Sequence, residues 1–372
     1  MADIRVLIVD DSLMVREMLT DILEADTGIS VVGTAENGLR AVELTCSLMP
    51  DVVAMDVTMP VMGGLEAIER IMSTTPVPIL VITDLDHSKI AFSALSKGAL
   101  DVYQKSFASK EMASDLIAKI KLLSKMKVIR HILPRGNDAR AGVPSFEQRK
   151  KALAQSGGIE EKKPVVPLSG GGERKTGLRS LQVVAIASST GGPRALAQIF
   201  SEMQEGFSVP IVVAQHMNDG FVNGLVEWLN SVSPIKVKFG ANGEMLRENH
   251  AYFAPPGTHI TVNASGQVKL VSSTADDLFH PSCNMLLSSV AKAFGAHSAG
   301  VILTGMGDDG VEGIRSIREQ GGYTIAQDEA TSIVFGMPKV AIDKGVVDKV
   351  SPLGEIGATL QQLVERKVRC EK

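Results

Sequence analysis

The chain has 372 residues, of which 44% are hydrophobic, 22% charged and 4% aromatic, and its formal net charge is −4. At roughly 150 residues per domain, this length favours two globular domains with mainly aliphatic cores. The charge is too small to indicate nucleic-acid or membrane-surface binding, and no apolar run approaches the roughly 20 residues that span a bilayer.

The cysteines and the N-terminus indicate where the protein works. Cys46, Cys283 and Cys370 are few, odd in number and far apart, and they have no metal-ligand spacing. The opening MADIRVLIVDD shows no secretory pattern. We therefore expect reduced thiols, a cytoplasmic location and no insertion into a membrane.

Residues 1–125 alternate between apolar runs and segments of helical periodicity. Repeated strand–helix units predict a doubly wound α/β domain with a five-stranded parallel sheet of order 2-1-3-4-5. The expected strands are Ile4–Val9, Ile29–Val32, Val52–Met55, Ile79–Thr83 and Leu100–Tyr103, and the expected helices are 13–25, 39–48, 64–73, 87–97 and 109–127.

Residues 126–180 lose this alternation. From about residue 134 onward the segment is rich in Gly, Pro and charged residues and has no sustained apolar period, which predicts an interdomain linker. A short helix near 146–155 is compatible with the pattern. An insertion within one domain is the alternative, but complete strand–helix patterns on both sides disfavour it.

Residues 181–372 resume the strand–helix alternation and predict a second, three-layer α/β/α domain with a mostly parallel sheet. The region 250–273 contains short strand-like segments with turns, which indicate a hairpin. The other expected strands are 181–189, 209–216, 298–305 and 323–328, and the expected helices are 193–203, 220–231, 282–294, 310–319 and 337–343.

Polar residues follow the strands of the first domain. Asp10 and Asp11 come after the first strand and Asp56 after the third, so a 2-1-3-4-5 sheet would gather three carboxylates at one edge. Such a cluster is costly without a cation, and its oxygen ligands suit Mg²⁺. Thr83 ends the fourth strand and Lys105 follows the fifth, and both could bind phosphoryl oxygens. Taken singly, Asp11 could cap a helix and Lys105 could be a surface charge.

The segments VLIVDDS, MDVTMPVMGGLEAI and VITD, with a late lysine, resemble the receiver domains of bacterial response regulators over residues 4–125. The resemblance implies that Asp56 accepts a phosphoryl group, that Asp10, Asp11, Asp56 and the Thr58 carbonyl bind Mg²⁺, and that Thr83 and Lys105 serve the switch. Three positions depart from the usual pattern, namely Gly63, Val102 and Ser106.

Ser189 ends an apolar strand and precedes Thr190, Gly191, Gly192 and Pro193. The glycines allow a tight turn and the proline suits a helix start, so the serine would lie among free N–H groups able to stabilise an oxyanion. Helix capping by a serine or threonine and a phosphate- or nucleotide-binding turn are the alternatives.

His216 ends the next strand, and Asp308 and Asp309 follow the strand 298–305. A lone histidine or aspartate there is more often structural, and either aspartate could cap a helix or bind a cation. Together with Ser189, however, these residues supply a nucleophile, a base and an orienting acid at the carboxyl ends of parallel strands. The remaining histidines have no ligand spacing and are expected to be structural: His87, His131, His250, His259 and His297.

The segments IASSTGGPRAL, VAQHM, YFAPPGTHI, HPSCNMLLSS, GVILTGMGDDGVEG and SIVFGMPKVAI resemble the catalytic domain of the CheB methylesterases over residues 181–350. The resemblance implies that Ser189 is the nucleophile, His216 the base and Asp309, rather than Asp308, the orienting acid. It also places Thr190, Gly191, Gly192 and Met306 beside the site, and Asn284 and His280 depart from the family pattern.

The same resemblance implies hydrolysis of glutamate γ-methyl esters on methyl-accepting chemotaxis receptors, glutamine hydrolysis as in some members, and no cofactor for the ester chemistry. Phosphorylation by a chemotaxis histidine kinase would expose the site. Alternatives are a DNA-binding output domain, although no helix-turn-helix or basic stretch is found, a non-catalytic adaptor, and a nucleotide-binding domain, although no phosphate-binding glycine motif is found.

Overall fold

The computed structural model describes residues 3–84, 88–105, 110–126, 128, 180–274, 277 and 279–370. Two parallel sheets and one antiparallel hairpin form the strand framework of these residues. Almost all of the predicted linker, including the expected helix near 146–155, lies outside the described residues, and the boundaries at 125 and 180 stay predictions.

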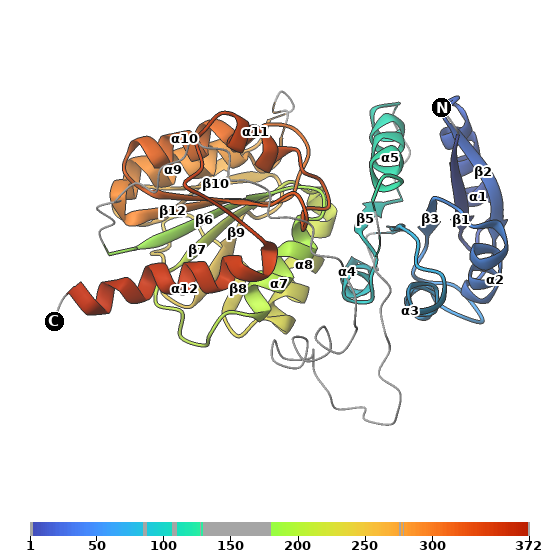
Figure 1. Ribbon diagram of the computed structural model, residues 1–372, viewed down its shortest axis with the longest axis horizontal. Coiled ribbons are helices and arrows are strands. Elements are labelled where there is room, and N and C mark those ends of the chain that lie inside the picture. Colours follow the sequence, from blue (N-terminus) through green and yellow to red (C-terminus); the bar gives the residue numbers. More distant parts are fainter. Residues whose placement is uncertain are drawn as a thin grey trace, which may run out of the picture. The chain divides into compact units, whose positions relative to one another are not determined.

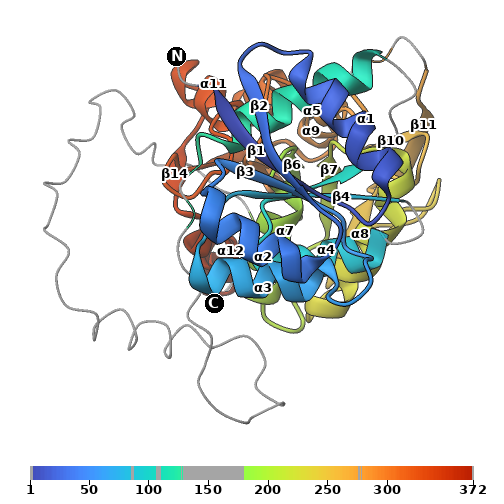
Figure 2. The ribbon, with the colours of Figure 1, turned by 90° about the vertical axis from the view of Figure 1, so that its right-hand side faces the viewer.

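The first sheet has five parallel strands in the predicted order β2-β1-β3-β4-β5. Figure 2 shows α1 and α5 on one face and α2, α3 and α4 on the other. The elements are β1 Ile4–Val9, α1 Leu13–Glu24, β2 Ile29–Ala35, α2 Gly38–Leu48, β3 Val52–Met55, α3 Gly64–Thr74, β4 Ile79–Thr83, α4 Ser88–Ser96, β5 Asp101–Gln104 and α5 Lys110–Leu123.

Local sequence explains how this sheet positions its polar edge. β3 and β4 are buried along their whole length, because helices cover both faces of a parallel sheet. α1 begins after Ser12, whose side chain accepts the Val15 N–H. At Gly64 a Cβ atom would lie 2.1 Å from the Asp56 carbonyl oxygen, so only glycine lets α3 start so close to the Asp56 loop.

The second sheet has seven strands in the order β14-β13-β12-β6-β7-β9-β8, and every neighbouring pair is parallel. Its elements are β6 Val183–Ser188, α7 Gly192–Ser201, β7 Ile211–Gln215, α8 Asp219–Val232, β8 Lys236–Phe239, β9 His250–Phe253, α9 Cys283–Phe294, β12 Ser298–Ile302, α10 Val311–Glu319, β13 Tyr323–Gln327, α11 Met337–Asp343, β14 Lys349–Ser351 and α12 Leu353–Cys370.

Helices cover both faces of this sheet, as the three-layer prediction requires. α9, α10 and α11 lie on one face, and α7, α8 and α12 lie on the other (Figure 1). Alternate residues of β6 serve the two layers, and Val183, Ala185 and Ala187 pack into the cluster that contains Leu286 and Ile314. The buried centre of the sheet therefore holds the ends of β12, β6 and β7 in fixed relative positions.

The structure adds detail that the pattern did not contain. The predicted hairpin is formed by β10 Thr258–Val262 and β11 Val268–Ser272, whereas β9 joins the main sheet. The strands β8 and β14 were not predicted, because sheet-edge strands are short and lack a continuous apolar run. Helix α12 was not predicted either. In the described part of the chain, no helix combines the length and the apolarity needed to cross a membrane.

Candidate functional site

Three neighbouring strands bring the predicted nucleophile, base and acid to one edge of the second sheet. β6 lies between β12 and β7, and Ser188 pairs with Gln215 in the parallel register. Ser189 and His216 follow these two residues directly, and the His216 N–H donates to the Ser188 carbonyl at 2.9 Å. Asp309 lies in the loop after β12. The structure therefore brings Ser189, His216 and Asp309 to one edge of this sheet.

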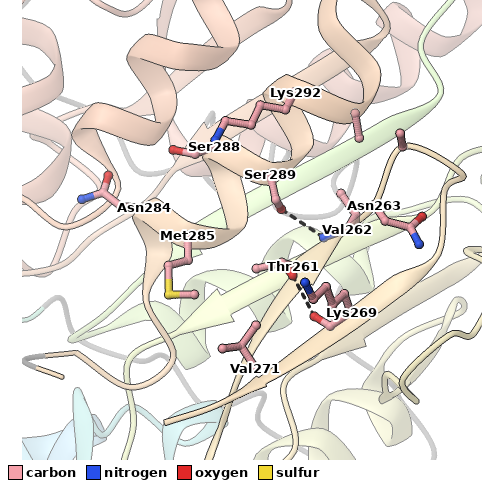
Figure 3. Close-up of a pocket in the computed structure, with 12 residues that line it drawn as sticks. Thr261, Val262, Asn263, Lys269, Val271, Asn284, Met285, Ser288, Ser289 and Lys292 are labelled. Carbon is pink, nitrogen blue, oxygen red and sulfur yellow. Dashed lines mark hydrogen bonds between the residues drawn. The ribbon is translucent and has the colours of Figure 1, made fainter. Parts of the chain in front are cut away.

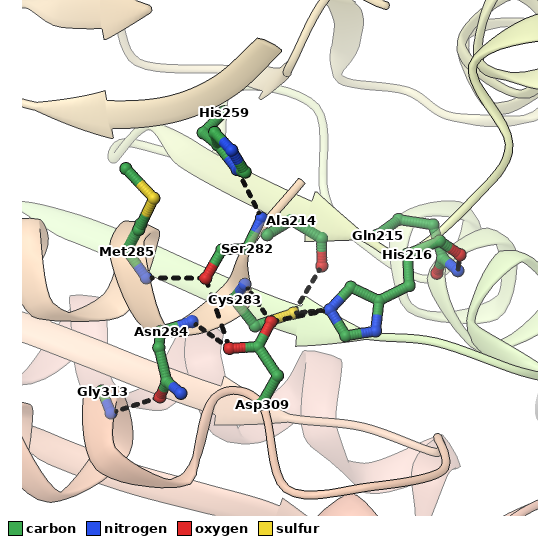
Figure 4. A network of polar contacts seen from close by, with 10 residues as sticks. All are labelled: Ala214, Gln215, His216, His259, Ser282, Cys283, Asn284, Met285, Asp309 and Gly313. Atoms are coloured by element: carbon green, nitrogen blue, oxygen red, sulfur yellow. Dashed lines mark hydrogen bonds and ion pairs between the residues drawn. The ribbon is translucent and has the colours of Figure 1, made fainter. Parts of the chain in front are cut away.

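His216 and Asp309 are joined directly. The His216 Nε2 atom lies 2.8 Å from Asp309 Oδ2 (Figure 4). A carboxylate accepts a hydrogen bond only from a protonated nitrogen, so in the neutral ring the proton is on Nε2 and the lone pair is on Nδ1. Phe279 stacks on the imidazole, with ring centroids 4.9 Å apart and planes 12° apart. Phe279 therefore packs on the face of the imidazole ring, and Asp309 holds the ring at its Nε2 edge.

The start of α9 holds the Asp309 carboxylate. The N–H groups of Cys283 and Asn284 donate to it at 2.7 and 2.9 Å, and the Ser282 hydroxyl donates at 3.3 Å. Burial opposes ionisation of Asp309, but the hydrogen bonds from His216 and from these N–H groups outweigh it and lower the pKa of Asp309. The side chain is 3% exposed, so it is a fixed anion beside the histidine.

The turn after β6 has a backbone shape that suits an oxyanion site. Gly191 has φ +78°, a conformation that favours glycine, and it caps α7. The Ser189 N–H donates to the Thr304 carbonyl at 3.1 Å, whereas the N–H groups of Thr190, Gly191 and Met306 have no acceptor among the described residues. Donors of this kind can stabilise a developing negative charge.

Ser189 itself is half-buried at this turn. Among the residues that the structure describes, no hydrogen bond joins its hydroxyl to His216, and none joins Thr190 to His216. Catalytic hydrogen bonds are often long in a site without substrate and shorten when substrate binds. The direct serine–histidine contact thus stays a prediction.

Sequence reasoning missed several residues that build the site. The Gln215 side chain accepts from the Ser188 hydroxyl at 2.7 Å and donates to the carbonyls of Ser189 and His216 at 2.8 Å each, so it ties the two strand ends together. At Gly192 a Cβ atom would lie 2.0 Å from Gln215 Oε1, which explains the glycine there. The position of Gln215 just before His216 was the only signal in the sequence.

Cys283 is a second residue that the sequence did not assign to the site. Its Sγ atom lies 3.3 Å from His216 Nε2 and 3.5 Å from the Ala214 carbonyl. Complete burial, together with the nearby negative charge of Asp309, raises the pKa of the Cys283 thiol well above its usual range. Cys283 is therefore a protonated thiol that packs against the base and is no competing nucleophile.

Of the remaining predicted residues of this domain, two are exposed and a third links two helices. Asp308 is exposed, and Met306 is 52% exposed at the surface of the site. Asn284, which departs from the family pattern, accepts the Gly313 N–H at 2.9 Å with its side chain and so links α9 to the first turn of α10. The structure thus separates Asp308 from Asp309 by burial.

A hollow of about 640 Å³ lies between α9 and the hairpin β10–β11 (Figure 3). It reaches Asn284, whose backbone binds Asp309, and it is lined by hydroxyl, amide and short apolar side chains. Lys269 and Lys292 on its wall are exposed, and the described residues give them no ion pair. The wall of this hollow therefore carries two exposed positive charges.

The first domain gathers its predicted polar residues equally closely. The Lys105 ammonium lies 2.6 Å from Asp10 Oδ2 and 2.7 Å from Asp56 Oδ2. Burial raises the pKa of Asp10 despite the nearby ammonium, and for Lys105 the two carboxylates outweigh burial and raise its pKa. Asp11 is exposed at the mouth of the cluster.

The donor set fits a hard divalent cation. Asp10, Asp11 and Asp56 each offer a carboxylate oxygen, and these atoms all lie within 4.8 Å of one another. Thr58 is exposed two residues beyond Asp56, beside the same loop. The Thr83 hydroxyl is buried and has no hydrogen-bond partner among the described residues. A buried, unpaired hydroxyl is costly, and a bound anionic group would satisfy it.

Comparisons with known proteins match each of the two domains to a family. The family model for CheB methylesterase matches residues 184–360, and that for the response regulator receiver domain matches residues 6–117. A protein-glutamate methylesterase/protein-glutamine glutaminase of Paramagnetospirillum magneticum is 41% identical over 366 residues, which cover 98% of this chain and 97% of that protein.

Two further relatives extend the comparison. A protein of the same name from Anaeromyxobacter dehalogenans is 39% identical over 363 residues, covering 97% of each chain. The crystal structure of the Thermotoga maritima CheB methylesterase catalytic domain is 38% identical and covers 50% of this chain and 100% of its own, with a TM-score of 0.48.

Proposed function

The chain belongs to the CheB family of protein-glutamate methylesterases, and from this premise we propose that Ser189, His216 and Asp309 are its catalytic triad. The protein is a serine hydrolase that removes methyl groups from glutamate γ-methyl esters under the control of a receiver domain. The observation that carries the triad proposal is the 2.8 Å contact between His216 Nε2 and Asp309, beside the turn that presents Ser189.

The first half-reaction follows from the ring orientation. Because Nε2 donates to Asp309, His216 Nδ1 is the basic nitrogen that takes the Ser189 hydroxyl proton as Oγ attacks the ester carbonyl. The unpaired N–H groups of Thr190, Gly191 and Met306 are the candidate donors to the tetrahedral oxyanion. Asp309 stabilises the imidazolium that forms, and its own low pKa keeps it ionised throughout.

The same groups complete both half-reactions. In the first, Nδ1 gives its proton to the methoxy oxygen, the C–O bond breaks and methanol leaves, so that a glutamyl ester of Ser189 remains. In the second, water attacks this ester while Nδ1 takes a proton from the water, and Nδ1 then returns that proton to Ser189 Oγ as the acyl C–O bond breaks, which frees the glutamate carboxyl group and regenerates the serine. An amide nitrogen in place of the methoxy oxygen would leave as ammonia, which corresponds to the glutaminase activity in the relatives' names.

The receiver pocket supplies the regulatory chemistry. We propose Asp56 as the phosphoacceptor, with Asp10, Asp11, Asp56 and the Thr58 carbonyl as the groups that would hold Mg²⁺. When bound, the metal would neutralise charge on the incoming phosphoryl group. Lys105 and the unpaired Thr83 hydroxyl are placed to bind phosphoryl oxygens.

Substrate and phosphodonor are assigned at the level of partner class. We propose methyl-accepting chemotaxis receptors as the substrate and a chemotaxis histidine kinase as the phosphodonor. Phosphorylation of Asp56 would raise hydrolase activity by exposing Ser189, a two-state bias produced by one local charge.

A fluorophosphonate probe tests the triad separately from the choice of substrate. In the presence of a small-molecule phosphodonor and Mg²⁺, we expect it to label the full-length protein at Ser189, and we expect Ser189→Ala and His216→Ala to abolish labelling. Ser201→Ala, at the far end of α7, is the matched control and should label normally. No labelling of the wild-type protein would favour a non-catalytic adaptor over a hydrolase.

A further inference from the structure

His259 lies in the hairpin strand β10 and is only 1% exposed. Its Nδ1 atom accepts the Ser282 backbone N–H at 2.9 Å (Figure 4), and its Nε2 atom lies 3.2 Å from Asp277 Oδ2. The ring stacks on His280 with centroids 6.0 Å apart. Both nitrogens of this buried imidazole therefore have a polar partner.

The bonding pattern argues against a metal site here, although His259, Asp277 and His280 have ligand atoms within 4.8 Å of one another. Because Nδ1 accepts an N–H, its lone pair is occupied and the ring proton must be on Nε2, where it faces the Asp277 carboxylate. Metal binding at Nε2 would move the proton to Nδ1 and break the bond to Ser282. The geometry therefore indicates a neutral ring in one fixed tautomer.

Asp277 is suited to hold that tautomer. Hydrogen bonds from the Thr274 N–H, from His259 and from the Thr274 hydroxyl lower the pKa of Asp277 to about 2. The carboxylate is consequently ionised at neutral pH and is an acceptor only. An acceptor at this position fixes the proton on Nε2 and leaves Nδ1 for Ser282.

Ser282 connects this histidine to the catalytic acid. It is the N-cap of α9, its hydroxyl accepts the Met285 N–H at 3.3 Å, and the same hydroxyl donates to Asp309 Oδ1 at 3.3 Å. The next two N–H groups, from Cys283 and Asn284, hold the same carboxylate. The position of the Ser282 backbone therefore sets the position of every α9 donor to Asp309.

We propose that His259 is a positioning residue of the methylesterase site, which fixes the start of α9 through the Ser282 N–H and thereby orients Asp309 toward His216. The inference rests on the proposed function, because it needs Asp309 to be the orienting acid. It predicts a loss of turnover with little loss of substrate affinity, because His259 acts on the base through two intermediates and touches no reacting atom.

A matched pair of substitutions tests the role. An asparagine side chain can place its carbonyl oxygen near the position of Nδ1, whereas the longer glutamine reaches the position of Nε2 and leaves Ser282 without an acceptor. We expect His259→Asn to retain most of the wild-type kcat and His259→Gln to lose about 10²-fold, the scale of a misplacement near 1 Å, with KM within about twofold. His250→Gln, at the half-buried first residue of β9, is the control and should behave as wild type.

Two readouts on the full-length protein separate the possible outcomes. One is methanol release from methylated receptor membranes, and the other is the rate of fluorophosphonate labelling of Ser189, which needs no receptor; both are measured with a small-molecule phosphodonor and Mg²⁺ present. Urea unfolding identifies any variant that merely destabilises the fold. Slow labelling and slow release in His259→Gln, with recovery in His259→Asn at equal stability, would support the inference.

Other results would overturn it. Equal losses in the Asn and Gln variants that follow their loss of stability would reduce His259 to a structural residue. Wild-type rates in His259→Gln would show that Ser282 needs no acceptor, and the triad proposal would stand. A wild-type protein that neither labels nor releases methanol would contradict the proposed function, and this inference would fall with it.

Discussion

The two polar sites lie in the same place in their folds but accommodate buried carboxylates differently. In the receiver domain, Asp10 and Asp56 share one ammonium, that of Lys105. In the hydrolase domain, Asp309 has no cationic lysine or arginine among its described partners and is held by backbone N–H groups, a hydroxyl and an imidazole. The receiver site therefore balances two buried carboxylates with one side-chain cation, whereas the hydrolase site holds one carboxylate mainly with donors at the start of a helix.

This difference agrees with what each site has to do. A carboxylate paired with a side-chain cation can exchange that cation for a metal ion or accept a phosphoryl group, because the pocket tolerates a change of charge. A carboxylate held by the start of a helix cannot move without moving the helix, and a triad acid needs that rigidity. We therefore expect bound cations to change the stability of the receiver site. In the hydrolase site, we expect small displacements of Asp309 to change the rate of turnover.

The largest expected effect is a loss of kcat in the hydrolase site, on substitution of Asp309. Asp309→Asn keeps the shape of the side chain but weakens its hold on the protonated ring, so kcat should fall about 10⁴-fold. The matched control is Asp308→Asn, which alters the exposed neighbour and should change kcat by less than about twofold. Methanol-release kinetics check both variants, and equal losses would contradict the assignment of the acid.

An intermediate effect is expected in the charge-balanced site. Lys105→Met leaves Asp10 and Asp56 buried without a cation, so the free energy of unfolding at pH 7 should fall by about 3 kcal/mol. Mg²⁺ should restore part of this loss, because the metal replaces the missing charge. Lys97→Met, which breaks the more exposed pair with Glu69, is the control and should cost about 0–1 kcal/mol. Urea titrations with and without Mg²⁺ measure both losses.

The smallest expected effect is on the pH dependence of stability, which should have opposite signs for Asp309 and Asp10. The pKa of Asp309 is lowered by folding, so its ionisation stabilises the fold above pH about 4, and this contribution is lost as the pH falls. The pKa of Asp10 is raised, so its protonated form favours the fold below pH about 4, and this contribution is lost as the pH rises.

Substitution with asparagine should therefore give opposite slopes in buffers without Mg²⁺. Relative to wild type, Asp309→Asn should become more destabilised as the pH rises from about 3 to about 7, and Asp10→Asn should become less destabilised over the same range. Urea unfolding at several pH values checks the slopes. Parallel slopes would show that the two sites hold their carboxylates in the same way.

Much of both sites was predictable from the sequence, because function in parallel sheets gathers where strands end and these strands are continuous apolar runs. That logic places Asp56 beside Asp10, and Ser189 beside His216, without any structure. It cannot find Cys283, Phe279 or His259, whose contacts with the site cross from distant segments. Their positions depend on how α9 and the hairpin pack, which no local pattern encodes.

The ring orientation of His216 is a second feature beyond the reach of the sequence. A serine, a histidine and an aspartate in a predicted triad do not specify which imidazole nitrogen faces the acid. Here Asp309 contacts Nε2, because His216 follows β7 directly and lies beside the start of α9, which holds Asp309. The assignment of Nδ1 as the base thus depends on the packing of α9.

If a phosphorylated receiver controls a Ser189 hydrolase, methanol release from methylated receptor membranes should depend on both Ser189 and Asp56. Wild type, Ser189→Ala and Asp56→Asn would be compared with and without a small-molecule phosphodonor and Mg²⁺. We predict no release above background from Ser189→Ala, and release that the donor stimulates in wild type but not in Asp56→Asn. Undiminished release from Ser189→Ala would contradict the role of Ser189 as nucleophile, and equal stimulation of Asp56→Asn would contradict control by the receiver.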